Sequence, residues 1–176
     1  PSPPANLVQL LGRLRLATPD EIAAAGARAR QLAGDFPDFE SVWVDALASR
    51  RLLTPWQAAE INAGRGERLL CGPYLLASRL NGPHFAGCFA AMHSETRAPA
   101  RLYVVLRSQQ PLVDTLQQLK QLVARSQHTE RPTIYEFGTS DGAIWAATEA
   151  CEGITAGQWI AENGRSGQGK NMTGRS

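Results

Sequence analysis

One stretch of sequence decides the fold, and it reads GPYLLASRLNGPHFAGCFAAMHSETRAPARLYVVLR from Gly72 to Arg107. Apolar residues after the Gly72-Pro73 breaker predict a strand over 74–80. A second apolar run predicts a return strand over 88–93, and a third predicts a strand over 100–106. Because the connections between these runs are short, the three strands are expected to form an antiparallel meander.

Composition limits the kinds of protein this can be. The chain has 176 residues, of which 43% are hydrophobic and 19% charged, as in a globular protein with one domain or two small ones. A net charge of +2 without a basic run gives no reason to expect nucleic acid or an anionic membrane as partner. The three cysteines are widely spaced, so neither a disulfide framework nor a metal site is indicated. Without a signal peptide or an apolar run of about 20 residues, a cytoplasmic location is expected.

Helical periodicity dominates the chain ahead of these strands. Leucines at three- and four-residue spacing predict a short helix over 7–16. Thr18-Pro19 and Thr54-Pro55 each place an N-cap before a proline at the first helical position, which predicts two more helices. A further helix is expected over 38–49. We therefore divide this part into a leader with a short helix over 1–16 and a helical unit over 17–70.

The remaining chain adds one helix and two strands. Leucine and valine spacing predicts a helix over 112–125, and two apolar runs over 132–138 and 143–149 flank the hairpin signal Asp141-Gly142. The expected class is α+β: an N-terminal helical unit followed by a five-stranded antiparallel sheet with one packed helix. This second unit is assigned residues 71–162, and the Gly-, Ser- and Arg-rich residues 163–176 are interpreted as a flexible tail.

The strand pattern resembles the small lobe of a eukaryotic-type protein kinase. The segments Leu52–Ala58 and Ala63–Tyr74 also resemble the region that directly precedes the kinase domain in bacterial Ser/Thr kinases of the planctomycete type. The run Tyr135-Glu136-Phe137-Gly138 is similar to a common family form in the fourth strand. The resemblance ends after the hinge, since the chain contains no H-R-D, D-F-G or A-P-E motif.

The resemblance also places a vestigial nucleotide site. Aligned without a gap, the three glycines of the phosphate-covering G-x-G-x-x-G loop fall on Asn81, Pro83 and Ala86, and the valine after them falls on Cys88. The alanine and lysine of the V-A-I-K strand fall on Arg101 and Tyr103, and a one-residue slip would place the lysine on Val104 instead. The C-helix glutamate falls on Leu119, or on Gln118 with a slip. The gatekeeper falls on Thr148 and the hinge on Glu149 to Cys151. The only lysines of the chain are Lys120 and Lys170.

Phosphoryl transfer needs a cation on the phosphates, carboxylates that hold Mg²⁺ and a base near the acceptor hydroxyl. This chain supplies none of the three at the family's positions, so no catalytic residue and no strong cofactor binding are expected. The prediction is a non-catalytic, pseudokinase-like module that acts through protein contacts. Its partner would be a separate protein, a second copy of the chain or a large lobe at the hinge edge.

Three alternatives stay open. The chain could be a fragment of a divergent Ser/Thr kinase that still binds ATP, because hinge backbone groups are available whatever the side chains. The fold could be an unrelated α+β domain that resembles a kinase by chance. Arg50-Arg51, with Gln57 and Asn62 as base readers, could indicate helix-turn-helix DNA binding, although the apolar face of this helix and the low net charge disfavour it.

Overall fold

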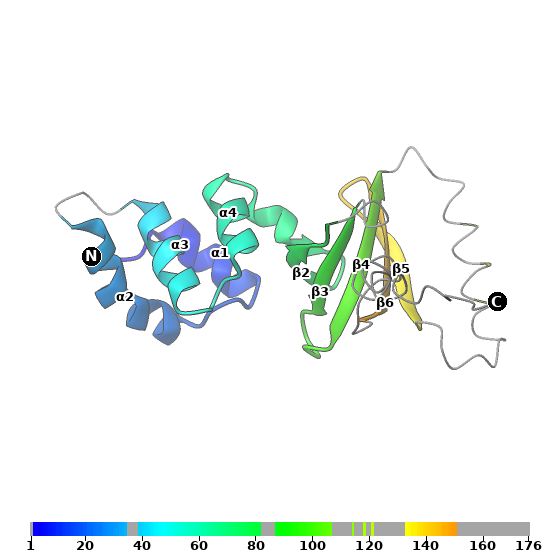
Figure 1. The fold of residues 1–176 in the computed structure, drawn as a ribbon, viewed down its shortest axis with the longest axis horizontal. Helices are drawn as coiled ribbons and strands as arrows, with labels where there is room; N and C mark the ends of the chain where they lie inside the picture. Colours follow the sequence, from blue (N-terminus) through cyan, green and yellow to red (C-terminus); the bar gives the residue numbers. More distant parts are fainter. Residues whose placement is uncertain are drawn as a thin grey trace, which may run out of the picture.

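The computed structural model of the chain describes residues 2–34, 39–81, 87–106, 114, 118, 121 and 133–150. It contains a group of helices followed by an antiparallel sheet, so the predicted α+β class is confirmed. Figure 1 shows the helices at one end of the molecule and the sheet at the other, with α4 beside the first strands.

The helical unit is built around one apolar core. Leu7 and Leu11 are fully buried in this core with Ile22, Trp43 and Leu47, so the segment assigned to the leader packs with the later helices. Arg15 adopts a positive φ of 52°, and the first helix accordingly ends earlier than its leucine spacing predicts. The helices are α1 (Ala5–Arg13), α2 (Pro19–Ala33), α3 (Glu40–Ser49), α4 (Pro55–Asn62) and a 3₁₀ turn, η1 (Gly66–Leu69).

Both Thr-Pro helix starts are confirmed. Thr18 and Thr54 are the N-caps of α2 and α4, and each accepts a hydrogen bond from the backbone N–H three residues later. Glu21 and Gln57 accept in return from the cap N–H groups, which completes a reciprocal capping box in each helix. Local sequence therefore specifies where these two helices begin.

The sheet has six strands, so the prediction of five was wrong by one. The additional strand is β1, only two residues long, which folds back on β2 through the Gly72-Pro73 turn. Gly72 has a φ of 56°, a value that glycine adopts without the cost that a Cβ would bring. The strands are β1 (Leu70–Cys71), β2 (Tyr74–Arg79), β3 (Cys88–His93), β4 (Pro99–Leu106), β5 (Ile134–Ser140) and β6 (Ala143–Glu149).

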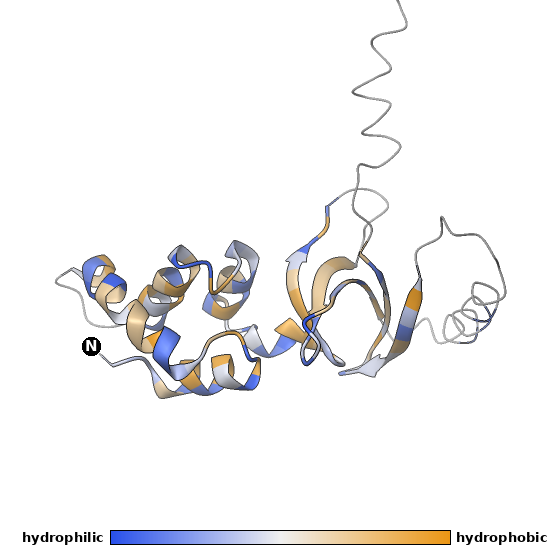
Figure 2. Ribbon diagram, turned by 90° about the horizontal axis from the view of Figure 1, so that it is seen from below, coloured by the Kyte–Doolittle hydropathy of each residue, from blue (hydrophilic) through white to orange (hydrophobic). Residues whose placement is uncertain are grey.

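The sheet combines the β2–β3–β4 meander with the β5–β6 hairpin. The predicted meander is confirmed, because β2, β3 and β4 pair in chain order. The Asp141-Gly142 turn joins β5 and β6, and β6 rather than β5 pairs with β4, which gives the order β1-β2-β3-β4-β6-β5. Figure 2 shows that the sheet curves strongly, with apolar residues along its strands.

The structure describes three residues of the predicted helix over 112–125. Asp114, Gln118 and Gln121 are helical and exposed, and their spacing of four and three residues places them on one polar face. The apolar stripe proposed for this helix, with Leu112, Leu116, Leu119 and Val123, lies outside the described residues.

The helical unit and the sheet meet at α4 and β2. Gln57 is only 3% exposed and its Nε2 donates to the carbonyl oxygen of Leu76 at 2.8 Å. Thr54 Oγ1 donates to the carbonyl oxygen of Ala77 at 2.5 Å, at the point where the pairing of β2 with β3 is irregular. The α4 capping box thus also binds β2, and it holds this strand against the helical unit.

Candidate functional site

The strand register places four of the predicted nucleotide-site positions on one face of the sheet. Cys88 lies directly opposite Tyr103, and Arg101 lies directly opposite Thr148. Because side chains alternate along a strand, all four belong to the same face, which we call the Cys88 face. The strand register therefore brings together residues that are up to 60 positions apart in the chain.

Two side chains on the Cys88 face, those of Cys88 and Tyr103, are held in their neutral forms. Cys88 is fully buried, and this burial raises the pKa of its thiol against the opposing effect of a hydrogen bond with Tyr103. Burial also raises the pKa of the Tyr103 hydroxyl, and a hydrogen bond with Arg101 acts in the opposite direction. At neutral pH neither group is a thiolate or a phenolate, so the pair offers no activated nucleophile or base.

The two positions predicted to carry the nucleotide contacts hold a tyrosine and an arginine. Tyr103, predicted at the position of the phosphate-binding lysine, is exposed. Arg101, predicted at the position of a small alanine, is half-buried and pairs with Thr148, the predicted gatekeeper. Arg101 is nevertheless a cation on the Cys88 face.

The residues predicted to form a hinge begin at the end of β6. Thr148 Oγ1 donates to the backbone oxygen of Glu149 at 3.3 Å. Glu149 is exposed, and its carboxylate accepts from the backbone N–H of Thr133 at 3.2 Å. This bond and the backbone bond from Glu149 N to Thr133 O, 2.8 Å long, tie the end of β6 to the start of β5.

The other predicted site residues are not brought into this group. Asn81 is exposed just beyond the end of β2. Pro83, Ala86, Leu119 and Cys151 lie outside the described residues, so their predicted places in the site stay predictions. Gln118, the alternative for the C-helix glutamate, is exposed on its helix.

Sequence reasoning missed a hollow on the opposite face of the sheet. This face carries Trp145 and Leu102 together with Tyr74 and Leu76, and we call it the Trp145 face. Part of it lines a hollow of about 440 Å³ near the Asp141 turn. No sequence motif marks this hollow, because it depends on which side chains the register brings together.

A second feature on the Trp145 face is the Tyr74 hydroxyl. It donates to the Glu136 carboxylate at 2.9 Å, and the Tyr74 ring makes edge contacts with His93 and Trp145. Burial, followed by the bond to Glu136, raises the pKa of Tyr74 well above its usual range. Tyr74 therefore links β2 to β5 across the curved sheet as a neutral donor.

The described residues offer neither a metal-ligand cluster nor a helix suited to a membrane. They contain no cluster of three or more histidine, cysteine, aspartate or glutamate side chains that could hold a metal ion. Within the same ranges, no helix has the length and apolar character needed to cross a membrane.

Comparison with known proteins shows a likeness to solved kinase structures. No protein-family model matches the sequence, and no curated protein matches it. Among solved structures, the chain is similar to the PknI kinase domain of Mycobacterium tuberculosis, in a single-mutant and a double-mutant form. Both are 20% identical, with TM-scores of 0.45 and 0.44 over 53% of this chain. The matches cover 39% and 38% of those kinase domains, so the chain spans about two fifths of their length.

Proposed function

We propose that this chain is a non-catalytic, pseudokinase-like module with the architecture of a bacterial Ser/Thr kinase small lobe, and that it works through protein contacts in cytoplasmic signalling. The support for this architecture is the sequence resemblance together with the arrangement of β2 to β6. Three hairpin-joined strands are followed by a segment with helical residues and then by a paired β5 and β6.

One observation carries the non-catalytic part of the proposal. The register places Tyr103 opposite Cys88 and Arg101 opposite Thr148. A tyrosine hydroxyl that keeps its proton cannot replace a lysine on the phosphates, and an arginine beside the gatekeeper fills space that a planar base would need. Catalysis of phosphoryl transfer depends on positioned charge, and Arg101 carries its charge beside the predicted gatekeeper and not at the predicted lysine position.

A second candidate function follows from Arg101. Its guanidinium lies on the Cys88 face and could contact phosphate groups from the neighbouring strand position. In that case the chain would be part of a divergent kinase that still binds ATP. Nucleotide binding that requires Arg101 separates this possibility from the favoured one.

The contact surface of the proposed module is the hinge edge at the end of β6. In the family, this edge faces the large lobe, and an uncovered edge would favour a second protein or a second copy of the chain. Ala150 is half-buried at this edge and Thr139 is exposed at the opposite end of the β5–β6 hairpin.

The experiment compares three forms of the protein. Sedimentation velocity and partner capture are measured for the wild-type chain, for Ala150→Arg and for the control Thr139→Arg. The proposal predicts a self-associated or partner-bound wild type that Ala150→Arg disrupts and Thr139→Arg leaves intact. A wild-type chain that is monomeric at all concentrations and captures no protein would contradict it.

A further inference from the structure

The hollow on the Trp145 face has an apolar interior. Leu76 of β2, Phe89 of β3 and Val104 of β4 line it from three neighbouring strands, and Cys71 of β1 lines it from the sheet edge. Burial, followed by the negative charge of Asp141, raises the pKa of the Cys71 thiol to about 11. The thiol is therefore neutral at physiological pH, and the interior carries no charge.

Small residues keep this space open. Ser140 and Ala143 face each other across the β5–β6 hairpin, and both line the hollow. Trp145 is on the same face, but its indole packs against Gly72 and Gly138, where an added Cβ would come within 2.5 Å and 2.7 Å of the ring. The Trp145 side chain therefore packs on these glycines and does not line the hollow.

Two opposite charges stand among the lining residues. Arg68 comes from η1 and Asp141 from the β5–β6 turn, and both are exposed. A cation and an anion together impose no net charge on a ligand, but they offer hydrogen-bond donors and an acceptor. The hollow therefore favours an uncharged molecule that has one hydrogen-bonding group.

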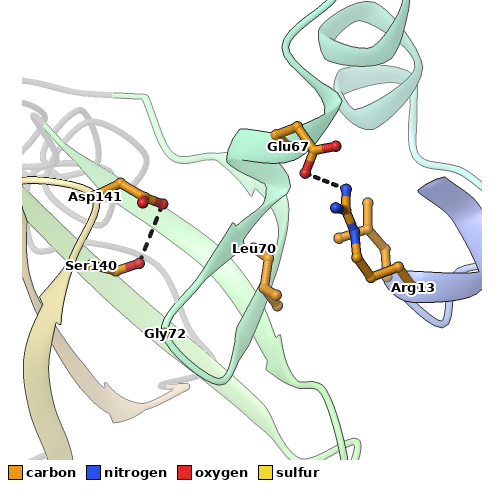
Figure 3. A pocket seen from close by; sticks show the side chains of 7 residues that line it. Arg13, Glu67, Leu70, Gly72, Ser140 and Asp141 are labelled. Carbon is orange, nitrogen blue, oxygen red and sulfur yellow. Dashed lines mark hydrogen bonds and ion pairs between the residues drawn. The ribbon is translucent and has the colours of Figure 1, made fainter.

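A smaller hollow of about 210 Å³ adjoins this region and shares Leu70, Ser140 and Asp141 with it. Figure 3 shows Arg13 and Glu67, which form an ion pair, on the helical side of it, and the Ser140–Asp141 turn on the sheet side. The larger hollow likewise has walls from η1 and from the β5–β6 turn. A molecule bound there contacts the helical unit and the sheet at the same time.

We propose that the hollow between η1, β1 and the Trp145 face is a binding site for a small, uncharged, mainly apolar molecule. A volume of about 440 Å³ is in the range of small-molecule sites in proteins. The apolar body lies on Leu76, Phe89 and Val104, and the polar group points toward Arg68 and Asp141. This site is distinct from the group of Cys88, Arg101, Tyr103 and Thr148, which belongs to the opposite face of the sheet.

The test uses N-phenyl-1-naphthylamine, an uncharged aromatic probe that fluoresces in apolar surroundings. The folded wild-type chain is expected to bind one probe saturably. The variant Ala143→Phe places a ring in the hollow and is expected to lower the affinity about tenfold or more. Thr139→Phe is the matched control, since Thr139 is exposed on the other face of the same hairpin, and it is expected to leave the affinity unchanged.

A second measurement keeps the test decisive if Ala143→Phe does not fold. In the wild type, the probe should shift the backbone amide signals of Cys71, Phe89 and Ala143 and leave those of Arg101 and Thr148 on the Cys88 face unchanged. Absence of saturable binding, equal binding by Ala143→Phe, or shifts confined to the Cys88 face would each overturn the proposal.

Discussion

Replacement of Gln57 by alanine tests how the helical unit is fixed to the sheet. Gln57 is the third residue of α4 and completes its capping box with Thr54, and its side-chain amide makes two hydrogen bonds. It accepts from Thr54 N at 3.0 Å and donates to Leu76 O at 2.8 Å, in a site where it is 3% exposed. Alanine removes both bonds and leaves space behind.

The expected cost follows from these three losses. The bond to Leu76 is worth about 1 kcal/mol net, the cap contribution about 1 kcal/mol, and the lost side-chain burial up to about 1 kcal/mol. Together they predict that Gln57→Ala lowers the free energy of unfolding by about 2–3 kcal/mol. This is a large share of the roughly 5–15 kcal/mol that stabilises a typical domain.

The chain contains its own control in the α2 capping box. Glu21 occupies the same position after a Thr-Pro start, but it is exposed, and the hydrogen bonds recorded for its side chain are those with Thr18. Urea unfolding followed by tryptophan fluorescence should therefore show a clearly smaller loss for Glu21→Ala than for Gln57→Ala. Equal losses would refute the idea that Gln57 joins the two units.

Two further predictions concern the Gly72 turn and its neighbour Cys71. At Gly72 the backbone has a positive φ, and an added Cβ would lie 2.5 Å from the Trp145 ring. Gly72→Ala should therefore lower the free energy of unfolding by about 2–4 kcal/mol. Gly142, in the β5–β6 turn, also has a positive φ but has open space around it, so Gly142→Ala should cost only about 1 kcal/mol. The Cys71 pKa of about 11 is raised above the ordinary 9.0, so the stability it contributes is fully present below pH 9 and is lost as the pH rises through 11. Cys71→Ala should flatten this alkaline loss in urea midpoints measured from pH 8 to 11, and an unchanged slope would contradict it.

The sequence predicts what is decided by a few neighbouring residues. The Thr18-Pro19 and Thr54-Pro55 starts specify two helices because the cap, the proline and the returning Glu21 or Gln57 lie within one turn. The Asp141-Gly142 hairpin is predicted for the same reason, since both residues adopt the positive φ values that the turn requires. The α+β class follows from the order of these local elements.

What could not be predicted depends on contacts between distant segments. Two residues, Leu70 and Cys71, are too few to show a strand period, and β1 exists because the Gly72 turn returns it to β2. The position of β6 between β4 and β5 needs pairing over a long separation, which no local signal encodes. The aligned nucleotide positions were identified by resemblance. The pairing of Cys88 with Tyr103 follows only from the strand register in the structure.

The most direct test of the account is a nucleotide titration of the wild-type chain. ATP with Mg²⁺ is added to millimolar concentration while the amide signals of Cys88, Arg101 and Thr148 are followed by NMR, together with the melting temperature. The account predicts no saturable shift and no rise in melting temperature. A saturable shift at these residues that Arg101→Ala weakens would contradict it and would favour a divergent kinase that still binds ATP.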